Sequence, residues 1–205
     1  MHVAEEVANR LLQINAIKLS PQNPFTWASG ILSPIYCDNR IALSYPEVRA
    51  VIRKGLVQEA NHFSGYDAIA GVATAGIAWG ILLAEALGLP YCYVRSKAKA
   101  HGRQNLIEGH VEPGSKVLVI EDLISTGGSS LKAVEALREH GCEVVGTLAI
   151  FTYGFAKAEK RFADAKCPLR TLSNYEVLLE EAVKTNYIQA ADVSMLQEWR
   201  SKTGE

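Results

Sequence analysis

The sequence lacks several features that define whole classes of protein. Its 205 residues contain no run approaching ~18 uninterrupted apolar residues, so no membrane-spanning helix is expected. The first residues carry neither the basic nor the apolar region of a secretory signal. The 21 Lys and Arg residues nearly balance the 22 Asp and Glu residues, and a formal charge of −1 gives no global attraction for nucleic acid or an anionic membrane. Any attraction for anions must therefore be local.

Cysteine is sparse, and familiar nucleotide-binding motifs are missing. The four cysteines, at positions 37, 92, 142 and 167, form no C-x-x-C pair, and no histidine cluster offers zinc spacing. Unpatterned cysteine in a chain of this length suggests a reducing compartment, so we expect a cytoplasmic protein. Gly71 and Gly76 have the spacing of a Walker loop, but Ile77 stands where that loop requires lysine. No G-x-G-x-x-G fingerprint of a dinucleotide site occurs either.

What the chain does have is an alternation of strand and helix patterns. The length suggests a single domain over residues 1–205, and 48% hydrophobic with 21% charged residues is globular composition. A capping box from Ser44 to Glu47 predicts the start of another helix. Because apolar strands alternate with helices, we expect an α/β fold with a central mostly parallel sheet flanked by helices. Strands are predicted at 67–72, 91–94, 116–120 and 144–151, and helices at 3–15, 77–87, 128–140 and from about residue 171 onward.

The segment after residues 116–120 carries the strongest signal, because ligands of such sheets bind beyond the carboxyl ends of the strands. Glu121 and Asp122 follow an apolar strand, and the small residues 125–129 lead into a helix. Backbone N–H groups of small residues at a helix N-terminus suit a phosphate monoester, while paired acids suit a sugar diol or Mg²⁺. The alternative is an ordinary helix N-cap formed by Ser or Thr.

The loop after residues 91–94 is basic. Arg95, Lys97, Lys99, His101 and Arg103 occupy every second position, so an extended chain would display them on one face. A basic lid would suit a pyrophosphate leaving group, and a solvated charged loop is the alternative. Nucleic acid is disfavoured as a ligand because no aromatic residues are interleaved for stacking.

The stretch Val117–Ser129 resembles the phosphoribosyl-diphosphate signature of the type I phosphoribosyltransferases, with four apolar residues, two acids and a small turn containing Thr-Gly. The resemblance implies the type I phosphoribosyltransferase fold, with Glu121 and Asp122 on the ribose hydroxyls and the turn on the 5′-phosphate. Mg²⁺ is implied as a cofactor carried mainly by the substrate, with Asp122 as the candidate protein ligand. The signature residues that would bind phosphoribosyl diphosphate are Glu121, Asp122, Leu123, Ile124, Ser125, Thr126, Gly127, Gly128 and Ser129.

The basic loop and residues 25–40 narrow this resemblance to the orotate phosphoribosyltransferase branch. Arg95, Lys99 and His101 match its catalytic loop, which implies that they neutralise departing pyrophosphate and that His101 is a candidate proton donor. Residues 1–40 would contribute to a hood over the pyrimidine, for which a β-hairpin packed on the core is the plain structural alternative. Ser125 is the candidate for the orotate carboxylate. The branch also implies a homodimer whose catalytic loop is shared across the interface, and partners that include neither nucleic acid nor a membrane.

The expected reaction transfers ribose 5-phosphate from phosphoribosyl diphosphate to orotate in pyrimidine biosynthesis. Ala28, Ala75 and Ser96 stand where many members of the branch have lysine, and Tyr153 where some have an arginine for orotate. A purine phosphoribosyltransferase is one rival, which the hood and the loop disfavour. A regulator that binds without reacting is another, and it would be expected to add a DNA-binding domain and lose the basic loop.

Overall fold

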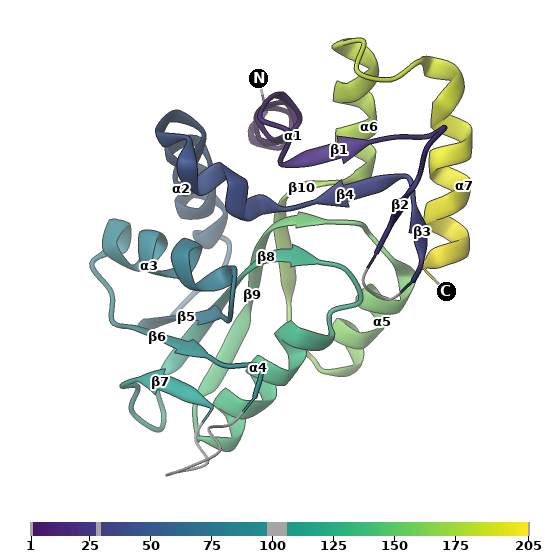
Figure 1. Ribbon diagram of the computed structural model, residues 1–205. Coiled ribbons are helices and arrows are strands. Elements are labelled where there is room, and N and C mark those ends of the chain that lie inside the picture. Colours follow the sequence, from purple (N-terminus) through teal and green to yellow (C-terminus); the bar gives the residue numbers. More distant parts are fainter. Residues whose placement is uncertain (1, 28–29, 98–105, 205) are drawn as a thin grey trace.

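The centre of the protein is a six-stranded sheet in the order β10-β9-β8-β5-β6-β7. It is seen in a computed structural model that describes residues 2–27, 30–97 and 106–204 (Figure 1). All neighbouring strands pair in parallel except β6 and β7, which are antiparallel. The expected mostly parallel α/β sheet is thereby confirmed. The strands are β5 (Ala68–Val72), β6 (Tyr91–Val94), β7 (Ile107–Gly109), β8 (Lys116–Ile124), β9 (Glu143–Thr152) and β10 (Leu169–Asn174).

Helices cover both faces of this sheet, which lies between them in Figure 1. One face carries α1 (Val3–Gln13), α2 (Pro46–Ala60) and α3 (Gly76–Leu87), and the other carries α4 (Gly128–Glu139) and α5 (Ala156–Asp164). The last two helices, α6 (Tyr175–Lys184) and α7 (Val193–Thr203), pack beside the β10 end of the molecule. Within the described ranges, no helix combines the length and the apolar character needed to cross a bilayer.

The order of the strands creates a topological switch point between β5 and β8. From β5 the chain passes through α3 to β6, and from β8 it passes through α4 to β9, in the opposite direction along the sheet. Since such crossovers are right-handed, α3 and α4 lie on opposite faces and leave a crevice at the carboxyl ends of β5 and β8. The backbone at Gly76 packs directly against β8, because a Cβ at this position would lie only 2.5 Å from the backbone oxygen of Ile120. The loop after β5 is therefore held directly against β8.

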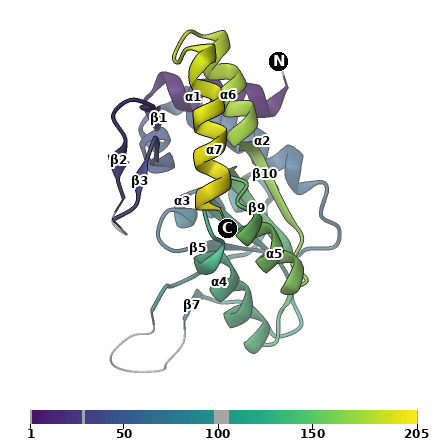
Figure 2. The same cartoon turned by 90° about the vertical axis from the view of Figure 1, so that its right-hand side faces the viewer.

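The N-terminal segment forms a separate antiparallel layer above the carboxyl edge of the sheet. β1 (Ile17–Leu19) pairs with β4 (Ile35–Cys37), and β2 (Phe25–Thr26) pairs with β3 (Leu32–Ser33). Figure 2 shows the β2–β3 hairpin beside α7, where Trp199 Nε1 donates a hydrogen bond of 3.1 Å to the backbone oxygen of Leu32. The ring of Trp27 also packs against Trp199, at a centroid distance of 5.8 Å. The predicted alternative of a β-hairpin packed on the core is therefore confirmed. Helix α1 is not part of this layer, because it packs on β10 and α6.

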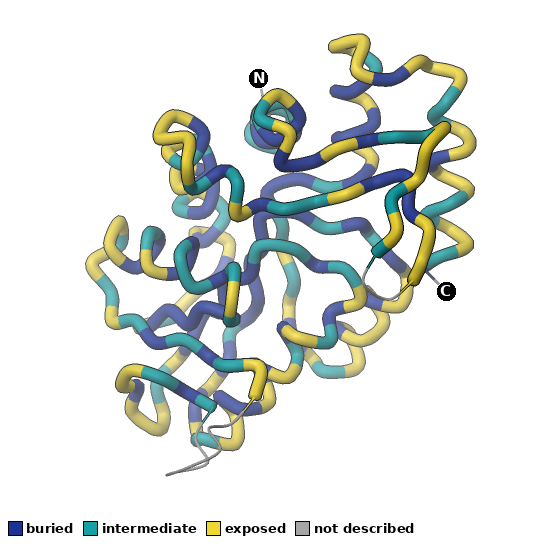
Figure 3. The backbone as a smooth tube through the Cα atoms, viewed as in Figure 1, coloured by how far each residue is buried: buried dark blue, intermediate teal, exposed yellow. Residues whose placement is uncertain are grey.

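The hydrophobic core follows the central strands, which are mostly buried along their length in Figure 3. Ile69 in β5, Leu118 and Ile120 in β8, and Leu148 in β9 have no exposed surface. Strands covered by helices on both faces bury consecutive residues, which explains their continuous rather than alternating apolar sequence. This buried sheet provides the rigid support for the loops at its carboxyl edge.

Three sequence-based expectations about the elements are wrong in detail. The capping box at Ser44 does not form, because Ser44 ends a 3₁₀-helix, η1 (Asn39–Ser44), and α2 begins at Pro46 without a side-chain cap. Proline suits the first position of a helix because its φ is already helical. β8 does not end at residue 120, since its pairing with β9 continues through Glu121 to Ile124. The acids therefore belong to the strand itself.

The third error concerns the C-terminal region, which is not helical throughout. Residues 169–174 form β10, which pairs in parallel with β9 and is the strand at one edge of the sheet. Its sequence, LRTLSN, mixes polar and apolar residues because only part of this edge strand is buried. Such a short mixed pattern gives no clear strand signal, whereas α6 and α7 after it are helical as expected.

Candidate functional site

A cavity of about 320 Å³ opens at the switch point. Three segments far apart in sequence supply its walls: the end of β4 with the start of η1, the loop after β5, and β8 with the first turn of α4. Larger hollows of about 710 and 670 Å³ lie between α4 and α5 and at the amino ends of β9 and β10, away from the switch point. The residues that line the switch-point cavity are Cys37, Asp38, Arg40, Ala73, Thr74, Ala75, Glu121, Asp122, Leu123 and Ser129.

Glu121 is the deeper of the two acids, with only 4% of its surface exposed. Its Oε2 accepts hydrogen bonds from Ser129 Oγ at 3.3 Å and Ser130 Oγ at 3.1 Å. Its Oε1 accepts one from the backbone N–H of Asp122 at 3.1 Å. Burial, followed by the charge of Asp122, raises the pKa of Glu121 to about 8. Glu121 therefore joins β8 to the first turn of α4.

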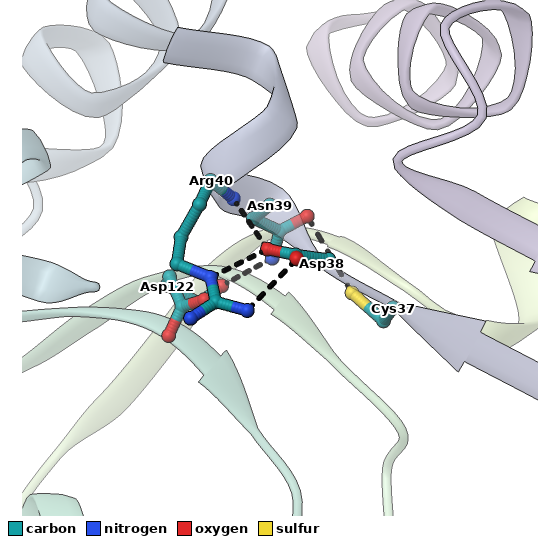
Figure 4. Close-up of polar contacts among 5 residues, drawn as sticks. All are labelled: Cys37, Asp38, Asn39, Arg40 and Asp122. Atoms are coloured by element: carbon teal, nitrogen blue, oxygen red, sulfur yellow. Dashed lines mark hydrogen bonds and ion pairs between the residues drawn. The ribbon is translucent and has the colours of Figure 1, made fainter. Parts of the chain in front are cut away.

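Asp122 is partly exposed to the cavity and is held through its backbone. Burial raises the pKa of its carboxyl, while hydrogen bonds and the nearby charge of Arg40 oppose that rise. The backbone oxygen of Asp122 accepts a hydrogen bond of 2.8 Å from Nδ2 of Asn39, a residue with no exposed surface (Figure 4). The N-terminal layer is thus tied to β8 at one of the two acids.

The turn between β8 and α4 lacks the ordinary Ser or Thr cap that was the alternative to a phosphate site. The N-cap of α4 is Gly127, with φ of 74° and no side-chain cap hydrogen bond. A Cβ at this position would lie 2.8 Å from the ring of Phe162, so the tight left-handed turn suits only glycine. Ser125 and Thr126 precede it, and the first N–H groups of α4 point toward the turn without a side-chain partner. This geometry suits an anion.

Arg161 supports the same turn from α5. Its Nη1 donates a hydrogen bond of 3.0 Å to the backbone oxygen of Thr126, and it lies 3.8 Å from where a Cβ of Gly128 would be. No local pattern connects Arg161 with a turn 35 positions earlier, so sequence reasoning missed this residue. Arg161 therefore fixes the outer side of the turn and adds positive charge beside it.

The remaining predicted residues lie at or near the carboxyl edge. Leu123 lines the cavity, whereas Ile124 is fully buried and its backbone oxygen accepts bonds from Thr152 Oγ1 and Tyr153 N, both 3.2 Å long. Arg95 follows β6 and does not line the cavity. Its Nη1 lies 3.3 Å from Oε1 of Glu108 in β7.

Several positions singled out by the sequence bear on charge. Lys99, His101 and Ala28 lie outside the described residues. Ala75 lines the cavity directly before α3, and Ser96 lies in a bend after β6. Neither of these two side chains can supply a positive charge.

Tyr153 stands where some relatives have arginine, and it plays an aromatic part. It is 3% exposed and stacks on Trp27 with a centroid distance of 5.6 Å and an interplanar angle of 22°. Burial, followed by the nearby Cys37, raises the pKa of its hydroxyl well above the usual value. Tyr153 is therefore a neutral contact between the sheet and the N-terminal layer.

Paired strand acids, a glycine turn at a helix N-terminus and a switch-point cavity lie together in this structure, as the resemblance to the phosphoribosyltransferases implies. A family model described as "Phosphoribosyl transferase domain" matches residues 43–186, which is most of the chain. The sequence is also 58% identical over 194 residues to the orotate phosphoribosyltransferase of Bacteroides fragilis, covering 94% of this chain and 92% of that protein. It is 54% identical over 206 residues to that of Cytophaga hutchinsonii, covering 100% and 99%.

Solved structures agree with these sequence relatives. The orotate phosphoribosyltransferase of Aeropyrum pernix superposes with a TM-score of 0.77 at 29% identity, over 89% of this chain and 99% of that one. The UMP synthase of Leishmania donovani gives a TM-score of 0.82 at 28% identity, over 96% of this chain and 42% of that one. The chain therefore belongs to the phosphoribosyltransferase family and, within it, to the orotate phosphoribosyltransferases. The fold and family indicated by the sequence are both confirmed.

Proposed function

We propose that this protein transfers ribose 5-phosphate from phosphoribosyl diphosphate to orotate, giving orotidine 5′-monophosphate and pyrophosphate. The bond between ribose C1 and the pyrophosphate oxygen breaks, a bond from C1 to N1 of orotate forms with inversion, and the proton of N1 is released to solvent. The observation that carries the proposal is the pair Glu121 and Asp122 beside the Gly127 turn at the switch point. The printed names of the sequence relatives support orotate as the acceptor.

The site suggests how phosphoribosyl diphosphate would lie. The N–H groups of the turn 125–129 would hold the 5′-phosphate, because they converge at a helix N-terminus. Carboxyl oxygens of Glu121 and Asp122 would accept hydrogen bonds from the ribose hydroxyls. The C1 end of the sugar would then point away from the turn, toward residues 73–75 and 37–40 on the other walls of the cavity. Arg95, Lys99 and His101 would neutralise the leaving pyrophosphate from the β6–β7 loop.

Mg²⁺ fits the donors available in this cavity. Magnesium prefers oxygen ligands and keeps several waters, so one carboxylate together with substrate oxygens is sufficient. Asp122 would hold the ion, since Glu121 is already engaged by two serine hydroxyls. When bound, Mg²⁺ supplies positive charge to the diphosphate.

Orotate would bind between the turn and the N-terminal layer. Ser125 precedes Gly127 in the turn and is our candidate for the orotate carboxylate. Residues 1–40 would contribute a hood, chiefly through the β2–β3 hairpin that Trp199 holds against α7. We further propose that residues 1–205 act as one phosphoribosyltransferase domain, because the layer, the sheet and α7 are joined by these contacts.

Two further proposals concern assembly and location. We expect a homodimer in which the basic loop of one subunit reaches the site of its partner. Arg95 supports this arrangement, since it starts the loop outside the cavity wall of its own subunit. We also expect the enzyme to work in the cytoplasm, a reducing compartment, and all four cysteines are unpaired thiols.

A single assay tests the reaction. The protein is mixed with phosphoribosyl diphosphate, Mg²⁺ and orotate, and loss of orotate absorbance is followed, with uracil, hypoxanthine and adenine as alternative acceptors. Uracil lacks the carboxylate, so donors built for that group would remain unpaired and the rate should fall by orders of magnitude. Equal rates with uracil would contradict orotate specificity, and a preference for hypoxanthine or adenine would favour a purine enzyme. Binding without turnover of any acceptor would favour a regulator.

A further inference from the structure

The charges around the site cavity are unbalanced. Asp38, Glu121 and Asp122 all contribute carboxyl groups to its wall, while Arg40 is the one cationic side chain among the described lining residues. The side chain of Arg40 is 60% exposed, compared with 16% for Asp38. Neither α2 nor the N-terminal strands bury this guanidinium, so it is accessible to a ligand in the cavity.

Arg40 is nevertheless held in a defined orientation. Its Nε lies 2.7 Å from Asp38 Oδ1 and its Nη2 lies 2.8 Å from Asp38 Oδ2, which is the two-point geometry typical of arginine and carboxylate. Asp38 Oδ1 also accepts the backbone N–H of Arg40 at 3.1 Å, capping η1. Hydrogen bonding from Arg40 holds the pKa of Asp38 below its usual range, so this partner stays ionised. An exposed arginine normally samples many rotamers, and this ion pair restricts them.

The fixed guanidinium is directed at the acids of the site. Figure 4 shows it between Asp38 and the side chain of Asp122, and Asp122 contributes to the charge environment of Arg40. Asp38 uses two of the five N–H donors that an arginine carries. The donors of Nη1 are not used by Asp38. Arg40 can therefore bind a second anion without releasing the first.

A diphosphate fits this edge better than any other part of the proposed substrate. If the turn holds the 5′-phosphate and the acids hold the ribose hydroxyls, the group on C1 lies toward Arg40 and residues 73–75. That loop, Ala73-Thr74-Ala75, offers no side-chain charge. A diphosphate next to the carboxylates of Asp38 and Asp122 would be repelled unless cations offset their charge, and besides any Mg²⁺ carried by the substrate, Arg40 is the cation that the described cavity wall offers.

We propose that Arg40 binds the pyrophosphate group of phosphoribosyl diphosphate and that Asp38 is its positioning residue. The inference rests on the proposed function for the orientation of the sugar. The N-terminal layer would then contact the leaving pyrophosphate as well as cover the pyrimidine. Arg40 comes from the same segment as Asn39, so one segment would fix the backbone of Asp122 and bind the group beside it.

Two probes separate this role from a general effect on the site. Binding of Mg²⁺-pyrophosphate and of ribose 5-phosphate is measured by calorimetry for the wild type and Arg40→Gln. Charged hydrogen bonds are involved, so we expect the substitution to weaken pyrophosphate binding roughly ten-fold or more. Affinity for ribose 5-phosphate should be unchanged, because that ligand uses the turn and the acids only. Arg170→Gln is the matched control, since Arg170 Nε forms a similar 2.8 Å pair with Glu59 Oε2 far from the cavity.

Asp38→Asn tests the positioning role. Asparagine keeps the Oδ1 that caps η1 but replaces the Oδ2 that fixes Nη2 of Arg40. We expect a smaller loss of pyrophosphate affinity than in Arg40→Gln, and no additional loss when the two substitutions are combined. Additive losses would contradict the positioning role, because Asp38 would then act independently of Arg40.

The remaining outcomes distinguish this inference from the reaction itself. Equal weakening of both probes by Arg40→Gln would show that Arg40 acts through Asp122, and the inference would be wrong. Unchanged pyrophosphate binding, or a wild type that binds ribose 5-phosphate but not pyrophosphate, would overturn it too. If the wild type fails to convert orotate yet binds pyrophosphate through Arg40, the proposed reaction fails and the Arg40 site stands.

Discussion

Asn39 donates a hydrogen bond of 2.8 Å from Nδ2 to the backbone oxygen of Asp122, joining two residues that are 83 positions apart. Asn39→Ala would leave that carbonyl without its partner in a partly buried place. We expect the free energy of unfolding to fall by about 1–3 kcal/mol and the KM for phosphoribosyl diphosphate to rise, because Asp122 loses its support. Chemical denaturation and steady-state kinetics measure both. Asn61→Ala, an exposed change after α2, should alter neither.

Asp122 itself should matter for binding rather than for folding. Asp122→Asn keeps the shape of the side chain and the backbone bond to Asn39, but it removes the charge that we propose binds the ribose and Mg²⁺. We expect weaker binding of phosphoribosyl diphosphate and a large loss of turnover, with an unchanged circular dichroism spectrum. Wild-type kinetics in this variant would reduce Asp122 to a structural residue at the end of β8.

Glu121 predicts a pH dependence of stability. Its pKa is raised to about 8 by burial, so the folded protein keeps a proton that the unfolded chain releases near 4.5. The free energy of unfolding of the ligand-free protein should therefore decrease as pH rises from about 5 to about 8, by at most ~1.4 kcal/mol per pH unit from this one group.

Glu121→Gln tests this pH dependence, because glutamine cannot titrate. In glutamine the amide oxygen can accept from Asp122 N–H, and the amide NH₂ can donate to the oxygens of the two serine hydroxyls, which in the wild type donate to Oε2. Denaturation of the wild type and the variant across this pH range should give a flatter curve for the variant. Parallel curves would mean that Glu121 is ionised throughout, contrary to its burial.

Trp199 should control the acceptor side of the site. Trp199→Phe keeps an aromatic ring but removes the indole N–H that bonds the backbone oxygen of Leu32 in the hairpin. We expect a higher KM for orotate with little change in the KM for phosphoribosyl diphosphate, because the hairpin is proposed to cover the pyrimidine rather than to bind the phosphoribosyl group. Initial rates with each substrate varied in turn give the two constants. Equal increases in both would contradict a role confined to the hood.

Subunit mixing tests the shared loop of the proposed dimer. Lys99→Ala and Asp122→Ala are each expected to be inactive alone. After random exchange about half the dimers are mixed, and a loop acting in trans gives each mixed dimer one intact site. Activity should then recover to roughly a quarter of the wild type. No recovery, with exchange verified by co-purification through a tag on one variant, would show that each loop serves its own subunit.

The sequence predicted the part of the site that is continuous along the chain. Residues 117–129 contain the strand, both acids, the turn and the start of α4, so local patterns are enough to define them. Gly88 ends α3 in the left-handed conformation expected of a glycine after a helix, with φ of 66°. The parallel sheet followed from the apolar strands by the same local reasoning.

Contacts between distant segments were not predictable in this way. Nothing in the order of residues shows that Asn39 reaches Asp122, that Arg161 reaches Thr126, or that Trp199 reaches the hairpin. Each contact depends on how the layers pack, which local patterns do not encode. β10 was missed for a related reason, since its strand conformation comes from pairing with β9 rather than from its own mixed sequence.

The close approach between the backbone of Gly76 and the backbone oxygen of Ile120 has a consequence for engineering this enzyme. Since a single methyl group would collide with the carbonyl of Ile120, the distance between the two halves of the crevice is set by main chain alone. Side chains on the rim, such as Ala75, can then be exchanged without altering that spacing. A library designed for new acceptors should therefore vary the rim and keep position 76 fixed, because the rim determines which ligand is chosen and the glycine determines whether a crevice exists.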